Sequence, residues 1–381
     1  MKRKKTIAAR HHIRLSKYRI KKIRKTVKRI LIVYWGMFGD CLISTPLIEA
    51  VHRNFRRAHI TYILGRGSSL SQNASRLLER NPNIDKYINS SMSILSDVLM
   101  EKPFDLVIDL CGRTTSQLIC KLSGAKIKLW GRFREIPDHF FYADRLNGKW
   151  TDPLKVDIDP HFYRADVLSK PAEVLGFKPK EGMVPKIYLS KKERRISKKY
   201  LRGFKSNNKD IIIAIHPGGR DPTRLWKTIN YSLLADRLIE KYNAKILVFY
   251  APREKHFADR VCKFSNNTLF KVYKKNVREY ASIISECDLF ISSDGGPLQI
   301  ALASETPSVG IFKFKSDTNV AHWYDYRKRR GLFYMFVRPA KYLKKNIDSK
   351  NIYKRDREEV RRAMKKAEEA LEFKENERNK I

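Results

Sequence analysis

Residues 288–313 contain the feature that most constrains the fold: an apolar run, a glycine turn, a helix-like segment and a second apolar run. Their sequence is DLFISSDGGPLQIALASETPSVGIFK. A strand that ends in a glycine turn and opens into a helix leaves backbone N–H groups free for an anion. Gly295 and Gly296 allow a close approach to the main chain, and Pro297 suits a first helical turn. This stretch alone fits an ordinary βα turn of a parallel sheet and a ligand site equally well.

The same succession of apolar run, turn and helical segment occurs in both halves of the chain. In the first half we expect strands at residues 30–35, 59–65, 104–110 and 126–131. In the second half the expected strands are residues 210–215, 244–250, 269–273, 289–291 and 309–312. Helical segments between these strands predict parallel sheets with right-handed crossovers. We therefore expect an α/β protein with two Rossmann-like domains facing across a cleft.

A polar stretch with prolines at residues 177–209 is the candidate boundary between these domains. The expected divisions are a basic arm, an N-terminal domain, a C-terminal domain and a charged C-terminal helix, at residues 1–29, 30–185, 186–345 and 346–381. Residues 132–160 are expected to form loops near a substrate-binding mouth. Residues 161–176 are expected to be helical, with a break at Pro171.

The charge of the chain is far from neutral. It has 80 Lys and Arg residues against 40 Asp and Glu residues, a net charge of +40. Such an excess implies a polyanionic partner, either nucleic acid or an anionic membrane surface. Because no RRM, KH, zinc or helix-turn-helix pattern occurs, we expect no specific nucleic-acid partner. Five scattered cysteines without a CxxC pair fit a reducing compartment and argue against a disulfide framework.

Residues 1–29 contain many Lys and Arg residues and no acidic residue. Apolar residues recur at nearly helical spacing at Ile13, Ile20, Ile23, Val27 and Ile30. The pattern predicts a basic amphipathic helix typical of an interfacial anchor, with a solvated tail or an RNA-binding arm as alternatives. The chain has neither the roughly 18-residue apolar run of a spanning helix nor a secretory signal. We therefore expect a cytoplasmic protein that can touch a membrane.

The chain from residue 351 onward is highly charged and favours a helix. Its apolar residues form a thin stripe at Val360, Met364, Ala367 and Leu371, and acids and bases pair at i,i+4 spacing. This pattern predicts a solvated helix that rests on the body of the protein.

A second glycine turn, residues 36–40, follows the first expected strand, and a helix is expected over residues 41–55. It is neither a GxGxxG fingerprint nor a P-loop. Asp40 lies where the turn enters the helix, so it either caps the helix or presents a carboxylate at the carboxyl edge of the sheet. A DxD triplet, Asp157 to Asp159, lies in a charged loop without a strand and is interpreted as a chance occurrence. We expect no metal and no cofactor.

Several of these turns together resemble the ADP-heptose:lipopolysaccharide heptosyltransferases, glycosyltransferase family 9. The shared motifs are GxxGD-x₄-TPL from residue 36, the FDLVIDL strand, SGAK-I-x-x-WG, HPGG followed by Arg-Leu-Trp, PxE at Pro252, and SxDGGP-x-x-x-A-x-A-x-x-TP from residue 292. They occur in order over about residues 30–315. One such motif is weak, but several in the right order and spacing are fairly specific.

The resemblance implies the GT-B fold and a metal-independent, inverting transfer of heptose from ADP-heptose to the inner core of lipopolysaccharide. It implies that Asp40 is the general base and that Gly39 and Thr45 belong to the acceptor-side turn. The N-terminal domain would bind the acceptor, and the C-terminal domain the nucleotide-sugar donor.

On the donor side, the family places a lysine two residues before the tryptophan, where it contacts the donor phosphates. Here that residue is Arg224, which can bind phosphate bidentately. Glu254 matches an acid that contacts the ribose. The remaining donor-binding candidates lie in the two glycine turns and are Gly218, Gly219, Asp294, Gly295, Gly296 and Pro297. Arg220 and Lys227 are possible phosphate contacts from their position, and equally possible surface charges. His216 is interpreted as structural.

Two positions depart from the family pattern. Members commonly have Thr or Ser after the aspartate of the donor turn, and His two residues after its proline, where this chain has Gly295 and Gln299. Both residues would lie beside the donor sugar. The departure therefore bears on the identity of the donor more than on the class of reaction. A same-fold glycosyltransferase that uses another nucleotide-sugar for a different surface glycan is the nearest alternative.

From another class, the chain could be a non-catalytic protein that binds polyanions or nucleotide-sugars. The presence of Asp40 and Asp294 in their turns argues against that alternative. The expected acceptor is a phosphorylated glycolipid of the inner leaflet, and residues 1–29 would hold the enzyme at this anionic membrane surface. The expected location is cytoplasmic and peripheral, on the inner face of the inner membrane.

Overall fold

The computed structural model describes residues 17–34, 36, 38–64, 74, 76–88, 94–101, 103–111, 114–133, 139–144, 168, 172, 175–177, 184–207, 209–274, 276–312, 332–337 and 349–379. The chain forms two compact units. The first unit comprises Met1–Trp35, Pro46–Ser68 and Asn83–Met183. The second comprises Gly36–Thr45, Ser69–Pro82 and Val184–Ile381. Two segments from the first half of the sequence therefore belong to the second unit.

The first unit is built on a six-stranded sheet in the order β3-β2-β1-β4-β5-β6. Its strands are β1 (Arg29–Val33), β2 (His59–Ile63), β3 (Lys86–Ile88), β4 (Leu106–Asp109), β5 (Ile127–Phe133) and β6 (His139–Asp144). Neighbouring strands are parallel except for β6, which pairs antiparallel with β5. The order reverses between β1 and β4, as in a Rossmann sheet.

Helices cover this sheet, and a run of apolar residues is buried inside it. Residues 30–33 of β1 are fully buried, as expected for a parallel strand with helices on both faces. Helices of the first unit include α1 (Lys17–Thr26), α3 (Thr45–Asn54), α5 (Ile94–Glu101) and α6 (Thr114–Leu122). Ile119 of α6 packs with Leu31 and Val107 in one apolar cluster.

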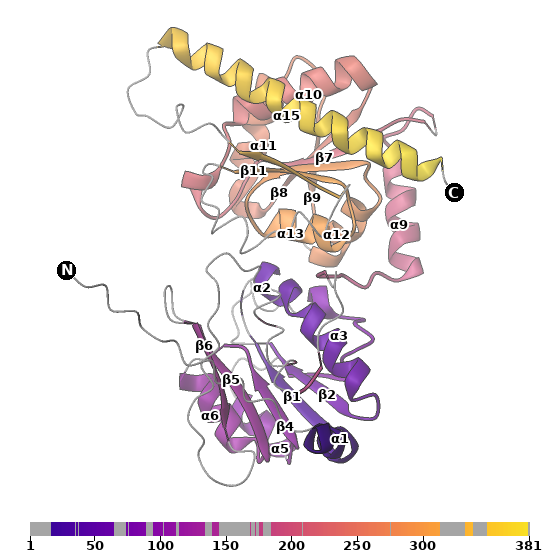
Figure 1. Ribbon diagram of the computed structural model, residues 1–381. Coiled ribbons are helices and arrows are strands. Elements are labelled where there is room, and N and C mark those ends of the chain that lie inside the picture. The colour runs from indigo at the N-terminus through magenta and orange to yellow at the C-terminus, as the bar shows by residue number, and fades with distance from the viewer. Residues whose placement is uncertain are drawn as a thin grey trace, which may run out of the picture. The chain divides into compact units, whose positions relative to one another are not determined.

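The second unit repeats the architecture with an all-parallel sheet in the order β12-β11-β10-β7-β8-β9 (Figure 1). Its strands are β7 (Ile212–His216), β8 (Lys245–Tyr250), β9 (Phe270–Tyr273), β10 (Leu289–Ser293), β11 (Ser308–Phe312) and β12 (Phe333–Val337). The order reverses between β7 and β10. Both sheets therefore have the Rossmann strand order that the sequence pattern predicts.

Two helical layers enclose this second sheet (Figure 1). One layer contains α2 (Phe38–Ile43), α9 (Lys191–Arg202), α12 (Val277–Ser285) and α13 (Gly296–Ala303). The other contains α10 (Thr228–Tyr242), α11 (Lys255–Phe264) and α15 (Ser349–Arg378). Val360, Met364, Ala367 and Leu371 of α15 are buried in that second layer, which confirms the predicted apolar stripe. Short 3₁₀ turns, η1 (Pro222–Arg224) and η2 (Pro252–Glu254), follow β7 and β8.

Several expectations about individual elements are wrong. The helix expected over residues 41–55 is two helices, because α2 ends at Ile43 and Pro46, which has no N–H to donate, lies at the start of α3. Within the expected loop at residues 132–160, β6 pairs along the open edge of β5. The sequence reading missed α5 and β12. The DxD triplet and most of residues 161–176 lie outside the described residues.

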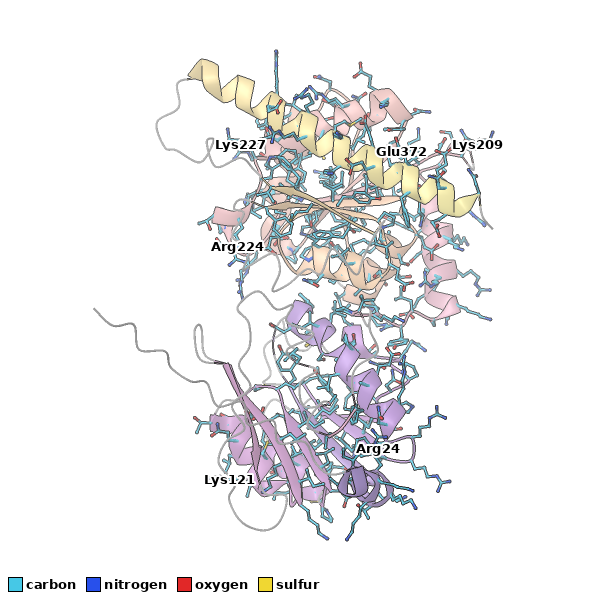
Figure 2. All side chains as sticks on the ribbon, in the orientation of Figure 1. Arg24, Lys121, Lys209, Arg224, Lys227 and Glu372 are labelled. Carbon is cyan, nitrogen blue, oxygen red and sulfur yellow. The ribbon has the colours of Figure 1, made fainter. Side chains whose placement is uncertain are left out.

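The basic amphipathic helix is real over α1, but its apolar residues face the protein. Val27 is buried, and the Cδ1 atom of Ile20 lies against Gly176, 2.0 Å from where a Cβ would stand. Arg24, labelled in Figure 2, lies 5.6 Å from the ring of Phe177. The described part of the expected anchoring face is thus used in packing within the first unit, and Ile13 lies outside the described residues. Ile30, assigned to the same face from sequence, is a core residue of β1.

The exposed side of α1 contains Lys21, Lys22 and Lys25. These lysines are therefore available to bind an anionic partner, whereas the apolar side of the helix is packed against the protein. None of the helices in the described ranges is both long and apolar enough to cross a membrane.

Candidate functional site

The candidate site lies in the second unit, at the carboxyl ends of β7 and β10, where the strand order reverses. Parallel sheets bind ligands at this point because the loops after the two strands diverge. His216 ends β7 and pairs in register with Ser292 of β10. The HPGG turn after β7 and the Asp294-containing turn after β10 therefore begin side by side.

Gly218 allows a carboxylate to lie directly over the first of these turns. A Cβ at residue 218 would stand 2.8 Å from the Cβ, Cδ and Oε2 atoms of Glu254. Real side chains do not tolerate that separation, so glycine is required for this contact. Gly219 is similarly crowded, since a Cβ there would lie 2.9 Å from Leu225.

Glu254 is held by a chain of hydrogen bonds. Its Oε2 atom lies 2.9 Å from His216 Nε2 and also accepts the backbone N–H of Ala251 at 3.2 Å. The Tyr280 hydroxyl lies 3.1 Å from His216 Nδ1. Burial raises the pKa of Tyr280 well above its usual value, so the phenol stays protonated. Because a carboxylate can only accept a hydrogen bond, the bond between His216 and Glu254 is donated by His216 Nε2–H.

This arrangement keeps Glu254 ionised. Burial would raise the pKa of its carboxyl, but the hydrogen bonds from His216 and from the Ala251 N–H outweigh burial and lower it. The contacts with His216 and Ala251 are both made by Oε2, and they fix the orientation of the side chain. His216 is thus structural, as the sequence reading held, and it orients a candidate ligand-binding residue.

Arg224 extends from η1 toward the turn after β10. Its Nη1 atom lies 3.1 Å from Asp294 Oδ2, and its Nε atom 3.1 Å from Asp221 Oδ2. The Arg224 side chain is 48% exposed, whereas that of Asp294 is 15% exposed. An ion pair with this exposure is weak, so an incoming phosphate can compete for the guanidinium.

The two other candidate cations differ in their surroundings. Arg220 is exposed and has no acidic partner among the residues that the structure describes. Lys227 is half-buried at the N-cap position of α10, and Figure 2 labels it near the same edge of the unit as Arg224.

The segment that bears Arg224 and Lys227 is fixed through Trp226. The Trp226 backbone N–H donates to Ser293 Oγ at 2.9 Å, and the Tyr231 hydroxyl lies 3.1 Å from the same atom. The buried indole Nε1–H donates to Glu359 Oε2 at 2.8 Å, and Asn230 Nδ2 donates to the same oxygen at 3.3 Å. Glu359, on α15, is fully buried. The C-terminal helix therefore helps to hold the segment beside the candidate site.

The turn after β10 opens α13 as predicted. The helix begins at Gly296, and Pro297 occupies its first turn. Gly295 is extended, and a Cβ there would make only an ordinary contact of 3.6 Å with Pro297. The turn therefore has room for a side chain at residue 295.

Asp40 reaches the same unit through α2, which packs against the start of α13. A Cβ on Gly39 would lie 3.3 Å from Gln299, and one on Gly296 would lie 3.6 Å from Phe38. The two glycines therefore let the helices approach closely. Gly36 has a separate role, because a Cβ there would stand 2.3 Å from the Cβ of Asp40.

Two residues close to Asp40 in the sequence, Cys41 and Thr45, have structural roles. Burial, and then the charge of Asp40, raises the pKa of the Cys41 thiol to about 12, so Cys41 is not a thiolate nucleophile. Thr45 is buried, donates to Leu42 O at 2.7 Å and accepts the backbone N–H of Lys186 at 3.0 Å. Its hydroxyl thus ties two chain segments together.

Three residues at this site were not predicted from the sequence: Tyr280, Ser293 and Glu359. Ser293 had a local signal, because it directly precedes Asp294 at the end of a strand. Tyr280 and Glu359 had none, because each reaches the site from a distant helix. Within the described ranges, no group of three or more His, Cys, Asp or Glu residues is arranged to hold a metal ion.

A family model that covers more than half of the chain identifies its family. A sequence model of glycosyltransferase family 9 (heptosyltransferase) matches residues 93–351. A lipopolysaccharide core heptosyltransferase, OpsX of Haemophilus influenzae, is 21% identical over 306 residues, which cover 77% of this chain and 81% of the relative.

Solved structures share the fold. A family 9 glycosyltransferase from Veillonella parvula superposes with a TM-score of 0.71 at 18% identity, covering 90% of this chain and 97% of the other. The E. coli ADP-heptose lipopolysaccharide heptosyltransferase II gives a TM-score of 0.64 at 16% identity, covering 88% and 99%. The GT-B fold expected from the sequence is thereby confirmed.

Proposed function

The chain belongs to glycosyltransferase family 9, the heptosyltransferase family, and on that premise we propose that it moves heptose from ADP-heptose onto the inner core of lipopolysaccharide. The domain expected over residues 30–185 would bind the acceptor, and that over residues 186–345 the donor. The observation that supports this most strongly is the packing of α2, which bears Asp40, against the first turn of α13. It brings a candidate base into the unit that contains the donor-binding candidates.

We assign Asp40 the role of general base in a single, inverting displacement. Its carboxylate accepts the proton of the acceptor hydroxyl as that oxygen bonds to the anomeric carbon. The bond from that carbon to the diphosphate oxygen breaks at the same time, and ADP leaves with the electron pair. A positioned base of this kind contributes roughly 10²–10⁴ in rate.

The leaving diphosphate gains negative charge, which the second unit can meet with side chains and backbone N–H groups. Arg224 is the main candidate, since its exposed guanidinium already binds a carboxylate at the site. Lys227 and Arg220 are the further cations. The backbone at Gly218, Gly219 and the start of α13 supplies N–H donors. No step of this scheme requires a metal ion.

Glu254 would hold the donor at its ribose. An ionised carboxylate is a good acceptor for a vicinal diol, and His216 and Ala251 fix its orientation. Gln299 and Gly295 would lie beside the sugar. Because Gly295 leaves room where relatives have a hydroxyl side chain, a different nucleotide-sugar is the alternative donor within the same reaction class.

The test of the donor assignment is a calorimetric titration with ADP, UDP, GDP and CMP on the parent chain and on Arg224→Gln. We expect selective binding of ADP that weakens in Arg224→Gln. The matched control is Arg260→Gln, an exposed arginine on α11 that should leave binding unchanged. Selective binding of another nucleotide would refute ADP-heptose as the donor.

The acceptor we propose is a phosphorylated glycolipid, which places the enzyme at the inner face of the inner membrane as a cytoplasmic, peripheral protein. Residues 1–29 would contact the anionic surface. Since the apolar side of α1 is packed against Gly176, this contact would be electrostatic. Lys21, Lys22 and Lys25, changed together to Gln, should lower affinity for anionic vesicles while transfer to a soluble acceptor analogue persists. Unchanged vesicle affinity would contradict the assignment.

A further inference from the structure

A second basic surface, separate from the candidate site and from α1, covers α9 of the second unit. Seven residues of this helix are exposed: Lys191, Lys192, Arg195, Ile196, Lys198, Lys199 and Arg202. Six of the seven are cations. Figure 2 shows nitrogen-tipped side chains projecting outward from α9.

The opposite side of α9 explains why the helix is rigidly held. Leu201 and Ser197 are buried, and Ser197 Oγ lies 2.8 Å from Ser282 Oγ on α12. Ser190 caps the helix in a reciprocal capping box with Glu193. The cations therefore project from a fixed scaffold, with their direction set by the packing beneath them.

The acids near α9 do not neutralise this surface. Glu193, the one acidic residue of the helix, is turned inward, where it pairs with Arg278 at 2.6 Å. Glu286 accepts Arg194 at 3.2 Å and Lys198 at 3.7 Å. Five exposed cations have no acidic partner among the described residues: Lys191, Lys192, Arg195, Lys199 and Arg202.

The charges of α15 are arranged differently from those of α9. On α15 the exposed Arg361 and Arg362 both pair with Glu358, at 3.1 and 2.7 Å, and the half-buried Lys366 pairs with Glu369 at 2.7 Å. Such pairing favours a helix whose charged face meets water alone. On α9, by contrast, five of the six exposed cations have no acidic partner among the described residues, and such an excess of positive charge is suited to an external anion.

We propose that the exposed face of α9 docks on an anionic lipid bilayer. A convex helix with long, separated cations matches a broad negative surface better than a small anion, which needs converging groups. Ile196 is 56% exposed in the middle of this face, where it can enter the interface between headgroups and acyl chains. The single aromatic residue of α9, Tyr200, packs against Phe204 and offers no platform for base stacking.

The test is sedimentation of the full chain with phosphatidylcholine vesicles that contain phosphatidylglycerol, without donor or acceptor. The variant Lys192→Gln/Arg195→Gln/Lys199→Gln should bind about a hundredfold more weakly, at about fivefold per charge removed. The control Arg260→Gln/Lys263→Gln/Lys365→Gln removes the same charge from exposed positions of the same unit. It should bind much more tightly than the α9 variant. Equal affinities of the two triple variants would overturn the proposal.

A second variant separates a bilayer from other polyanions. Ile196→Ser should weaken vesicle binding while leaving retention on a heparin column unchanged, because only the bilayer offers an apolar layer. If Ile196→Ser binds vesicles like the parent chain, the assignment to a bilayer is wrong. Loss of binding to a single-stranded RNA oligonucleotide in the α9 triple variant, with vesicle affinity intact, would assign the face to nucleic acid instead. Neither measurement depends on the proposed transfer reaction.

Discussion

Replacing Glu359 should destabilise the second unit and loosen the segment that contains Arg224. The Glu359 carboxylate is fully buried and accepts hydrogen bonds from Trp226 and Asn230, at 2.8 and 3.3 Å. In Glu359→Leu both donors lose this acceptor in a site without water access. Trp226 also bonds to Ser293 through its backbone, so a displaced indole would disturb the turn after β10.

The size of the effect follows from the two bonds. A hydrogen bond to a charged group contributes about 1.5–3 kcal/mol, and the longer bond from Asn230 should lie at or below the lower end. Removing a buried carboxylate also removes its desolvation cost, which offsets part of the loss. Glu359→Leu should therefore lower the free energy of unfolding by about 2–4 kcal/mol. Glu359→Gln keeps an oxygen acceptor and should cost about 1 kcal/mol.

The assay is urea unfolding followed by tryptophan fluorescence, combined with the KM for the nucleotide-sugar. Because a two-unit chain can unfold in steps, the transition of the second unit is the one to compare. Glu358→Gln is the matched control, since the adjacent Glu358 pairs, among the described residues, with the exposed Arg361 and Arg362, and its replacement should leave stability close to the parent value. Equal stability of Glu359→Leu and Glu358→Gln would refute this reasoning.

Two further predictions concern Gly218 and Glu193. Gly218→Ala should displace Glu254 and weaken nucleotide binding in calorimetry, whereas Gly295→Ala, with an ordinary 3.6 Å contact, should fold with parental stability. Full nucleotide affinity in Gly218→Ala would contradict the role of Glu254. Although burial opposes it, the hydrogen bonds from Arg278 and Ser190, with the charge of Arg278, lower the pKa of Glu193 to about 2 from its usual 4.5. The stability that Glu193 confers over Glu193→Gln should therefore be complete above about pH 4.5 and vanish as pH falls through about 2. A difference that persists below pH 2 would exclude this linkage.

Local patterns predicted the elements whose signals lie within a few residues. The turns at residues 216–219 and 294–297 could be placed because each glycine turn directly follows a buried apolar run. The stripe on α15 could be placed because helical spacing alone defines it. The parallel sheets of both units could be predicted from the alternation of strands and helices.

What the sequence could not give depends on contacts between distant segments. Strand β6 forms because an open edge of β5 is available for pairing. The sequence of residues 139–144 alone does not indicate that this edge is open. In the sequence, Glu359 cannot be distinguished from the other acidic residues of a charged helix. Its role depends on the hydrogen bond from Trp226, which only the structure shows. Likewise, the apolar spacing of α1 suits both a bilayer and a protein surface, and only Gly176 against Ile20 distinguishes them.

The central claim is tested most directly by the transfer rate of Asp40→Asn with ADP-heptose and a lipopolysaccharide inner-core acceptor. As general base, Asp40 should contribute roughly 10²–10⁴ to the rate, so Asp40→Asn should lose about that factor in kcat. Nucleotide affinity should stay near the parent value, and Asp97→Asn on α5 should transfer at the parental rate. If Asp40→Asn turns over within a few-fold of the parent chain, Asp40 is not the base and the proposed mechanism is wrong.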